Sequence, residues 1–235
     1  MSGASLYELF RQPYVLNIFC DASLKRRGDT TDICYGAIAV NKDNIIDSIY
    51  RVNTDSTNNK GEAMAILAGL QLANMYKYTY SVINIFSDSQ VSILNIRDRY
   101  KNWTFIDDNY YIKSGGVLSN QEVYIQILQM ICECDLHINF FHQKGHVNSK
   151  SFKDIVHATK VFSTSNRIGR EIDYSFIRYI SGYNNIVDAY SRSTLSRMDT
   201  VNNKVICPFN YYATEELLNK YKKRGSNYEW KKFVS

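Results

Sequence analysis

Residues 35–51 read YGAIAVNKDNIIDSIYR, two apolar runs joined by a short polar turn. The runs at 35–41 and 45–51 have the length and composition of strands, and the turn at 42–44 favours a tight antiparallel connection. A further apolar run, VLNIF at residues 15–19, precedes them and also reads as a buried strand. The three runs together predict an antiparallel meander at the start of the fold.

Helices and strands alternate in the rest of the chain. Residues 62–75 are rich in Ala and Leu, which predicts a helix with a broad apolar face. The remaining elements are expected as a strand at 81–86, helices at 90–99 and 120–133, a strand at 137–142 and a last core helix at 185–195. This order predicts an α/β fold. Its five-stranded mixed sheet, three antiparallel strands followed by parallel strands, would be flanked by helices.

Length favours one substantial domain with additions at both ends. A chain of 235 residues is long enough for one α/β core and short for two. We expect an N-terminal extension at 1–13, a main domain at 14–196 and a basic, helical C-terminal extension at 197–235. The extension carries the signals of a capped helix, from Thr214 at its start to Gly225 just beyond its end.

Composition narrows the class of protein. The net charge of +5 permits a polyanionic partner without requiring one. Five cysteines without a CxxC step indicate neither a zinc site nor a disulfide framework. No apolar run has the length of a signal peptide or a membrane span, so we expect a soluble, intracellular, cytoplasmic protein with no membrane partner. Enrichment in Asn, Ile, Tyr and Lys is typical of an AT-rich genome, bacterial or viral.

Four carboxylates stand out by their positions. Asp21 follows the first strand, Glu62 opens the first long helix, Asp88 follows the fourth strand and Asp188 lies in the last core helix. Taken singly, an Asp after a strand is usually a turn residue, and Glu62 could simply favour the positive end of the helix dipole. Gathered at one edge of a sheet, the four would repel one another unless a cation neutralised them. Hard oxygen ligands favour magnesium or manganese over zinc.

Five short motifs fall on these elements. In chain order they read Phe19-Cys20-Asp21-Ala22-Ser23 with Tyr35-Gly36-Ala37-Ile38, Thr57-Asn58-Asn59-Lys60-Gly61-Glu62, Ser87-Asp88-Ser89-Gln90, Lys144-Gly145-His146, and Asn184-x-x-x-Asp188-x-x-x-Arg192. Their content and order resemble the type 1 ribonuclease H family, part of the ribonuclease H-like superfamily. The resemblance spans most of the chain but does not include the C-terminal extension.

The resemblance implies a fold, an activity and a set of catalytic residues. The fold would be ribonuclease H-like, and the activity endonucleolytic hydrolysis of the RNA strand of RNA–DNA hybrids, leaving 5′-phosphate and 3′-hydroxyl ends. Asp21, Glu62, Asp88 and Asp188 would bind two Mg²⁺ ions, or Mn²⁺ in their place. His146 would assist proton movement or product release, although an exposed loop histidine is the plainer interpretation.

The same resemblance implies substrate contacts. Thr57 would touch a phosphate of the DNA strand, and Asn58, Asn59 and Gln90 would reach into the minor groove, where amides read 2′-hydroxyls and base edges. The plainer interpretation of the Asn pair is a turn or a helix cap. The expected substrate-binding set is completed by Ser23 and Asn184.

A long segment separates His146 from Asp188, where the family has a short one. This insertion, residues 150–183, mixes arginines with aromatic residues, which suits nucleic acid binding but also a helical subdomain on the surface. It contains a rival fourth carboxylate, Asp154. We prefer Asp188 because Asn184 and Arg192 flank it as the motif requires, and expect the insertion to be a surface addition.

The region after the fourth strand only partly resembles the basic, Trp-containing protrusion with which many bacterial members grip their substrate. Residues 105–111, FIDDNYY, are acidic and aromatic, which argues against a basic protrusion. Basic residues of the C-terminal extension are candidates to contact phosphates instead. The basic and Trp residues concerned are Arg97, Arg99, Lys101 and Trp103 in the first region, and Lys220, Lys222, Lys223, Arg224, Lys231 and Lys232 in the second.

Two other functions stay open. One keeps the fold and the metals but acts on branched or single-stranded nucleic acid, and Asn58, Asn59 and Gln90 argue against it because they suit a minor groove lined with 2′-hydroxyls. The other is an inactive nucleic-acid-binding module of a replication complex. Such modules tend to lose carboxylates, whereas all four are present in this chain.

Overall fold

The computed structural model describes residues 4–54, 56–197 and 212–224. The predicted helix end at Gly225 and the basic residues Lys231 and Lys232 lie outside the described residues. None of the helices within these ranges is long and apolar enough to cross a membrane.

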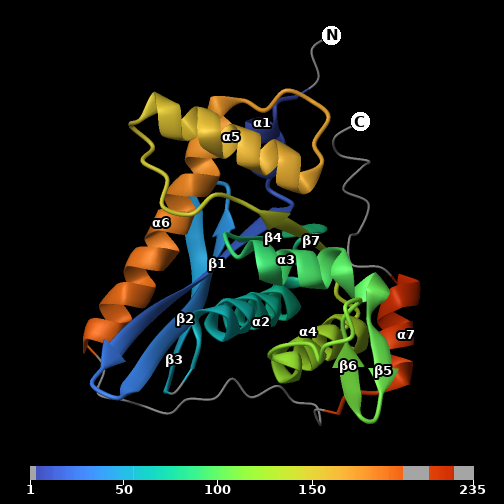
Figure 1. Ribbon diagram of the computed structural model, residues 1–235. Coiled ribbons are helices and arrows are strands. Elements are labelled where there is room, and N and C mark those ends of the chain that lie inside the picture. The colour runs from blue at the N-terminus through green and yellow to red at the C-terminus, as the bar shows by residue number, and fades with distance from the viewer. Residues whose placement is uncertain (1–3, 55, 198–211, 225–235) are drawn as a thin grey trace.

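A five-stranded mixed sheet forms the centre of the protein (Figure 1). Strands β1 (Val15–Arg27), β2 (Thr30–Asn41) and β3 (Asn44–Thr54) pair antiparallel, as the three apolar runs predicted. Strands β4 (Val82–Ser87) and β7 (Ile138–His142) add in parallel, giving the order β3-β2-β1-β4-β7. The predicted α/β fold class is confirmed.

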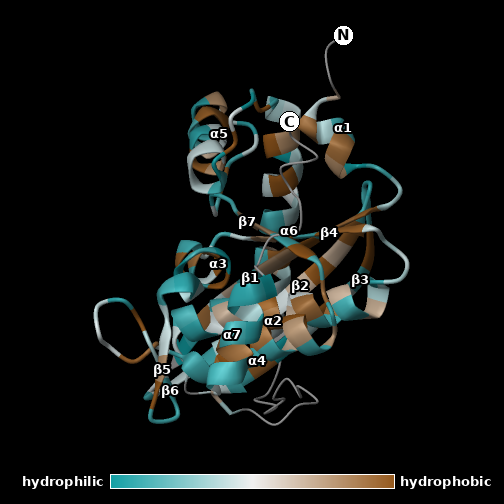
Figure 2. Cartoon of the chain, turned by 90° about the vertical axis from the view of Figure 1, so that its right-hand side faces the viewer, coloured by the Kyte–Doolittle hydropathy of each residue, from teal (hydrophilic) through white to brown (hydrophobic). Residues whose placement is uncertain are grey.

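Helices cover both faces of this sheet, and alternate residues of β1 point to opposite faces. Ile18 packs against α2 (Asn58–Tyr76), which α4 (Gln121–Glu133) covers in turn, whereas Phe19 packs with α6 (Tyr174–Arg197). Figure 2 shows the sheet as largely hydrophobic, which is why it must be covered on both sides. The first face also carries α3 (Gln90–Arg97), and the second α1 (Leu6–Phe10) and α5 (Phe152–Asn166).

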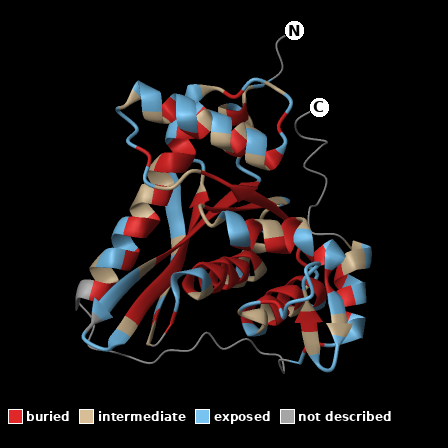
Figure 3. Ribbon diagram, viewed as in Figure 1, coloured by how far each residue is buried: buried red, intermediate tan, exposed pale blue. Residues whose placement is uncertain are grey.

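Helix α2 is buried almost all round, as Figure 3 shows by its red ribbon. It lies between the sheet and helices α3 and α4, so both of its sides face protein. Thr57 caps its start by accepting a hydrogen bond from the Lys60 amide at 3.3 Å. A fixed helix start matters because Glu62 lies one turn further on.

The segment after α3 forms elements that the sequence did not predict. A 3-10 turn at Arg99–Asn102 leads into a small hairpin of β5 (Thr104–Ile106) and β6 (Asn109–Tyr111). Asp107 and Asp108 form its two-residue turn with φ of 46° and 60°, a conformation that Asp tolerates better than most residues. The hairpin shares a core with Trp103, which is only 1% exposed.

The insertion at 150–183 is not the surface addition that the sequence predicted. It consists of α5 and the first turns of α6, which begins at Tyr174 and not at residue 185. Phe162 and Phe176 are fully buried and contact each other at 5.2 Å between ring centroids. With Phe86 they belong to a second core on the α6 face of the sheet. Burial of these side chains thus stabilises additional helical turns before the Asn184-x-x-x-Asp188-x-x-x-Arg192 motif from which the last helix was predicted.

The C-terminal helix α7 (Glu215–Arg224) packs against α4. Lys220, Lys222 and Arg224 each bind a group of the protein, Lys220 at the exposed surface, and their contact with phosphates stays a prediction. Lys220 pairs with Glu133 at 2.7 Å, Lys222 donates to the Trp103 carbonyl at 2.6 Å, and Arg224 pairs with Asp135 at 2.7 Å. Lys223 is exposed.

Arg97 is also not the exposed protrusion residue that the sequence suggested. It is 6% exposed and donates to the Asn166 side chain at 2.8 Å and the Ser165 carbonyl at 2.6 Å. The guanidinium therefore ties α3 to the end of α5. A buried arginine needs such partners because an unpaired buried charge is strongly destabilising.

The second core yields a prediction about stability. Phe162→Ala should lower the free energy of unfolding by about 3–5 kcal/mol, because it removes a buried ring stacked near Phe86 and Phe141. Urea denaturation would measure the loss. Val156→Ala on the same helix, where the side chain is 41% exposed, is the matched control and should change stability by less than about 0.5 kcal/mol. A loss below about 1 kcal/mol for Phe162→Ala would show that α5 is not part of the core.

Candidate active site

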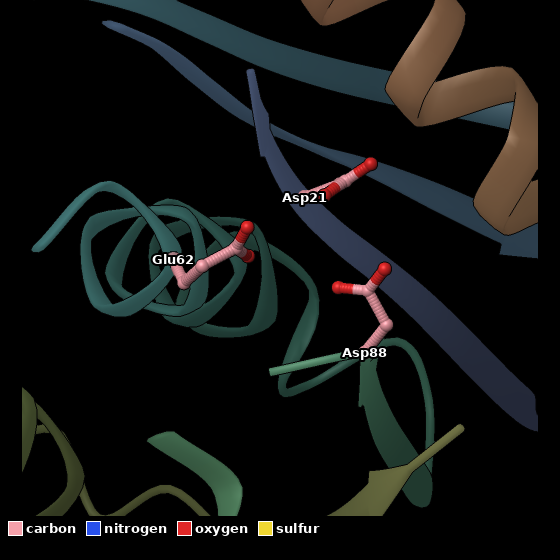
Figure 4. Close-up of side chains that lie close together, drawn as sticks. All are labelled: Asp21, Glu62 and Asp88. Atoms are coloured by element: carbon pink, nitrogen blue, oxygen red, sulfur yellow. The ribbon is translucent and has the colours of Figure 1, made fainter. Parts of the chain in front are cut away.

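Two carboxylates meet because of the register of the parallel strands. Cys20 of β1 pairs with Ser87 of β4, so the next residues along each strand, Asp21 and Asp88, lie side by side. Glu62 reaches them from the first turns of α2 (Figure 4). Gly61 allows this approach, because a Cβ there would lie 2.0 Å from the Ile33 Cδ1.

The three side chains form a compact oxygen cluster. One carboxylate oxygen from each of Asp21, Glu62 and Asp88 lies within 4.8 Å of the others. Figure 4 shows the three carboxylates gathered between β1, the start of α2 and the end of β4. This is a spacing that a divalent cation can bridge.

The fourth carboxylate beside this cluster is Asp188, not Asp154. Asp188 on α6 lines the same cleft and pairs with Arg192 at 2.9 Å. Asp154 lies in the first turn of α5, where its side chain accepts a hydrogen bond from the Asn148 amide at 3.3 Å. The geometry thus agrees with the preference for Asp188 that its flanking residues gave.

Burial and mutual repulsion raise the pKa of the Asp21, Glu62 and Asp88 carboxyl groups above their usual range. Burial, followed by the charges of Asp88 and Asp188, raises the pKa of Asp21 to about 8. Burial and the Asp21 and Asp88 charges raise the pKa of Glu62 well above its usual range, and burial also raises that of Asp88. Oε2 of Glu62 is buried and has no hydrogen-bond partner among the described residues. An unpaired buried oxygen beside three other carboxylates fits the ligand set of a hard divalent cation.

A cleft of about 350 Å³ opens over the carboxylates. Asn58, Asn59 and Gln90 line it from the starts of α2 and α3, and their contact with a minor groove stays a prediction. Ser23 and Thr57 are not among the described lining residues. Ser23 lies two residues beyond Asp21 on β1 and Thr57 directly precedes Asn58, and their contact with a substrate stays a prediction.

His146 lies on the loop after β7. Its side chain is 75% exposed and its Nδ1 lies 3.5 Å from the Asp188 carboxylate. The preceding Gly145 packs directly on Asp88, because a Cβ there would lie 2.1 Å from the Asp88 Oδ2. A glycine at this position therefore lets the histidine loop close over the carboxylate.

Comparison with known proteins identifies the family. The family model for RNase H matches residues 13–155, more than half of the chain. The chain belongs to the RNase H family. The match ends before Asp188, so the place of this residue beside the other carboxylates rests on the geometry above. A search of curated proteins found no match.

Solved structures resemble this RNase H at low sequence identity. RNase H1 from the halophilic archaeon Halobacterium salinarum is 17% identical, with 55% of this chain and 86% of that chain covered and a TM-score of 0.40. LC11-RNase H1 in complex with an RNA/DNA hybrid is 16% identical, with 55% and 85% covered and a TM-score of 0.41. The foamy viral protease-reverse transcriptase in complex with an RNA/DNA hybrid is 13% identical, with 66% and 20% covered and a TM-score of 0.46.

A buried relay behind Asp88 was missed by the sequence analysis. Gln143 is 1% exposed and its side-chain amide donates to the Asn184 Oδ1 at 2.7 Å. Asn184, 2% exposed, in turn hydrogen-bonds the Asp88 carboxylate. This position favours a positioning role for Asn184 over the substrate contact predicted for it. The sequence signal for Gln143 was only its place at the end of a strand, next to Lys144-Gly145-His146.

Crowding of the carboxylates predicts a pH-dependent stability of the metal-free protein. A carboxyl group whose pKa is raised to about 8 on folding stabilises the fold below the unfolded pKa, and this contribution is lost as pH rises through about 8. In Asp21→Asn this stability is not lost, because the amide stays neutral at every pH. In EDTA, the melting temperature of Asp21→Asn should therefore exceed that of the wild type by more at pH 8 than at pH 5. An equal difference at both values would contradict the crowding.

The relay predicts an effect on cation binding without a large effect on folding. Gln143→Leu keeps the side-chain volume but removes the donor that orients Asn184, and should weaken Mn²⁺ binding about tenfold. Calorimetric titration would measure the affinity and thermal unfolding the stability. Gln126→Leu on α4, whose side chain bonds only its own helix, is the matched control. Unchanged Mn²⁺ affinity in Gln143→Leu would leave the relay a purely structural contact.

Proposed function

We propose that this RNase H hydrolyses the RNA strand of RNA–DNA hybrids endonucleolytically, leaving 5′-phosphate and 3′-hydroxyl ends. The observation that carries the proposal is the gathering of Asp21, Glu62 and Asp88, with Asp188 beside them, in a cleft lined by amides. A cluster of buried carboxylates is destabilising by itself, so its presence in a family of nucleases supports a cation-dependent reaction.

Asp21, Glu62, Asp88 and Asp188 would hold two Mg²⁺ or Mn²⁺ ions. When bound, such ions activate a water for attack on a phosphodiester and stabilise the leaving oxygen. The chain supplies the ligands and orients them: the parallel strands fix Asp21 and Asp88, and Asn184 holds the Asp88 carboxylate from behind. Ionised ligands are required, so cation binding would release the protons that burial retains.

Amides at the rim of the cleft suit a hybrid. Asn58, Asn59 and Gln90 are exposed at the starts of α2 and α3, where they can donate to and accept from 2′-hydroxyls and base edges. Thr57 and Ser23 would contact the substrate beside them, Thr57 at a DNA phosphate. His146 is exposed on a loop within reach of Asp188, which suits proton movement or release of the product.

The domain division follows from the same proposal. Residues 14–196 would be the catalytic unit, preceded by an extension at 1–13 and followed by a helical one at 197–235. The ion pair of Lys220 with Glu133 of α4 and the hydrogen bond of Lys222 to the Trp103 carbonyl support a bracing role for α7.

Cleavage of matched substrates would test the proposed function. Hybrid, RNA duplex, DNA duplex, branched DNA and single strands are incubated with the full chain in Mg²⁺ or Mn²⁺, and the products are mapped. The hybrid should be cut in its RNA strand only. Preference for branched or single-stranded substrates would favour the other nuclease function, and hybrid binding in EDTA without cleavage in either cation would favour an inactive binding module.

The fourth carboxylate predicts a contrast between two variants. Asp188→Asn should lower hybrid cleavage by at least about 100-fold, because it removes a charge from the cation site. Asp154→Asn is the matched control within the same segment and should keep nearly full activity, since its carboxylate bonds a loop amide away from the cluster. Loss of activity in Asp154→Asn with full activity in Asp188→Asn would overturn the assignment.

A further inference from the structure

Helix α5 and the start of α6 present an exposed surface that the catalytic cleft does not use. We call it the basic–aromatic face. On α5 the outward residues follow each other at spacings of three and four, so they share one side of the helix. The face consists of Phe152, Lys153, Val156, His157 and Lys160 of α5 with Tyr174 and Arg178 of α6, all exposed.

Aromatic rings form its centre. Phe152 is 64% and Tyr174 40% exposed, and their rings meet edge to face at 5.6 Å and 89°. The opposite side of α5 supplies the core through Ile155 and Phe162, so the outward rings are not needed to fill it. Exposed aromatic rings in contact with each other offer a flat apolar surface to a planar partner such as a nucleobase.

Positive charge surrounds these rings. Lys153, Lys160 and Arg178 form no ion pair with any residue in the described part of the chain, and neither does Lys150 just before α5. The neighbouring acids are Asp154 and Asp173, which accept backbone hydrogen bonds, and Glu171, which is exposed in the loop before α6. Cationic side chains without an ion-pair partner can bind the phosphates of a nucleic acid, and the aromatic rings between them can stack on bases that are not base-paired.

The face is linked to the catalytic cleft by the loop before α5, since His146, which lines the cleft, lies six residues before Phe152. The loop covers α6 between the two sites, where Ser181 is 3% exposed and Asn185 donates to the Val147 carbonyl.

Tyr174, Arg178 and Arg192 lie within about 40° of one another around the helix, and Arg192 pairs with Asp188 at 2.9 Å. Fourteen residues from Tyr174 to Asp188 correspond to about 21 Å along the helix axis. At about 3.4 Å per nucleotide, this is a distance of about six nucleotides. Figure 1 shows α5 beside the upper part of α6, next to the loop that follows β7.

We propose that the basic–aromatic face binds a single-stranded extension of the nucleic acid held in the catalytic cleft. The inference rests on the proposed function, since it takes the hybrid to lie over the carboxylates. A duplex would need only the cations, whereas unpaired bases also use the exposed rings of Phe152 and Tyr174. The extension would begin about six nucleotides from the scissile phosphate, where the face starts.

Binding of tailed hybrids to the full chain would test the inference. The probes are an RNA–DNA hybrid of about 12 base pairs, blunt or with a single-stranded tail of about ten nucleotides, of RNA or DNA and at either end. Fluorescence anisotropy in EDTA measures affinity without cleavage. The tail on one end should strengthen wild-type binding about tenfold, and a tail of abasic nucleotides should lose most of that gain.

Two sets of variants identify the residues. Phe152→Ala with Tyr174→Ala should bind tailed hybrid no better than blunt hybrid, while cutting blunt hybrid at the wild-type rate. Lys153→Gln with Lys160→Gln should reduce the slope of log affinity against log salt by about one to two for the tailed probe. Tyr78→Ala is the matched control, because Tyr78 is 93% exposed beside Lys77, beyond the end of α2 opposite to Glu62.

The outcomes separate this inference from the proposed function. No gain from any tail, or a gain that the Phe152→Ala and Tyr174→Ala protein keeps, would overturn the inference and leave the face to another partner or none. A wild type that binds hybrid but cuts none in Mg²⁺ or Mn²⁺ would instead refute the proposed function, with the tail dependence still measurable.

Discussion

Repulsion between buried carboxylates is the constraint around which this protein is organised. Asp21 and Asp88 are adjacent because β1 and β4 run parallel in a fixed register, and Glu62 is brought to them by the start of α2. The rest of the fold supplies the stability that offsets this repulsion. A sheet covered by helices on both faces holds the three side chains in place even while their charges favour separation.

Close packing around the cluster depends on small and neutral residues. Gly61 lets α2 approach the sheet and Gly145 lets the histidine loop rest on Asp88, positions where any Cβ would collide. Gln143 and Asn184 then fix the Asp88 carboxylate with amides, which add no further charge to a crowded site. The crowded carboxylates lower the stability of the metal-free protein, but they are already in position to bind a cation.

The two additions to the RNase H fold have different physical roles. The insertion supplies rings such as Phe162 to the core and, on its other side, an exposed face with Phe152 and Tyr174. The C-terminal helix α7 is held by two side chains that reach inward: Tyr221 is fully buried and donates to the Ile96 carbonyl, and Lys222 donates to the Trp103 carbonyl. The insertion therefore contributes both to the core and to the exposed surface, whereas α7 braces the hairpin and α3.

The sequence by itself determined the mixed sheet, the family and the group of carboxylates, because strand periodicity and short motifs at strand ends are local properties of the chain. Tertiary structure alone decided that α6 begins at Tyr174, that Arg97 is buried against the end of α5, and that Gln143 donates to Asn184 next to Asp88. Each of these depends on contacts between residues far apart in the chain. A local sequence pattern does not identify partners that are distant in the chain. The burial of these side chains and their hydrogen-bond partners are therefore defined only by the packing of the elements.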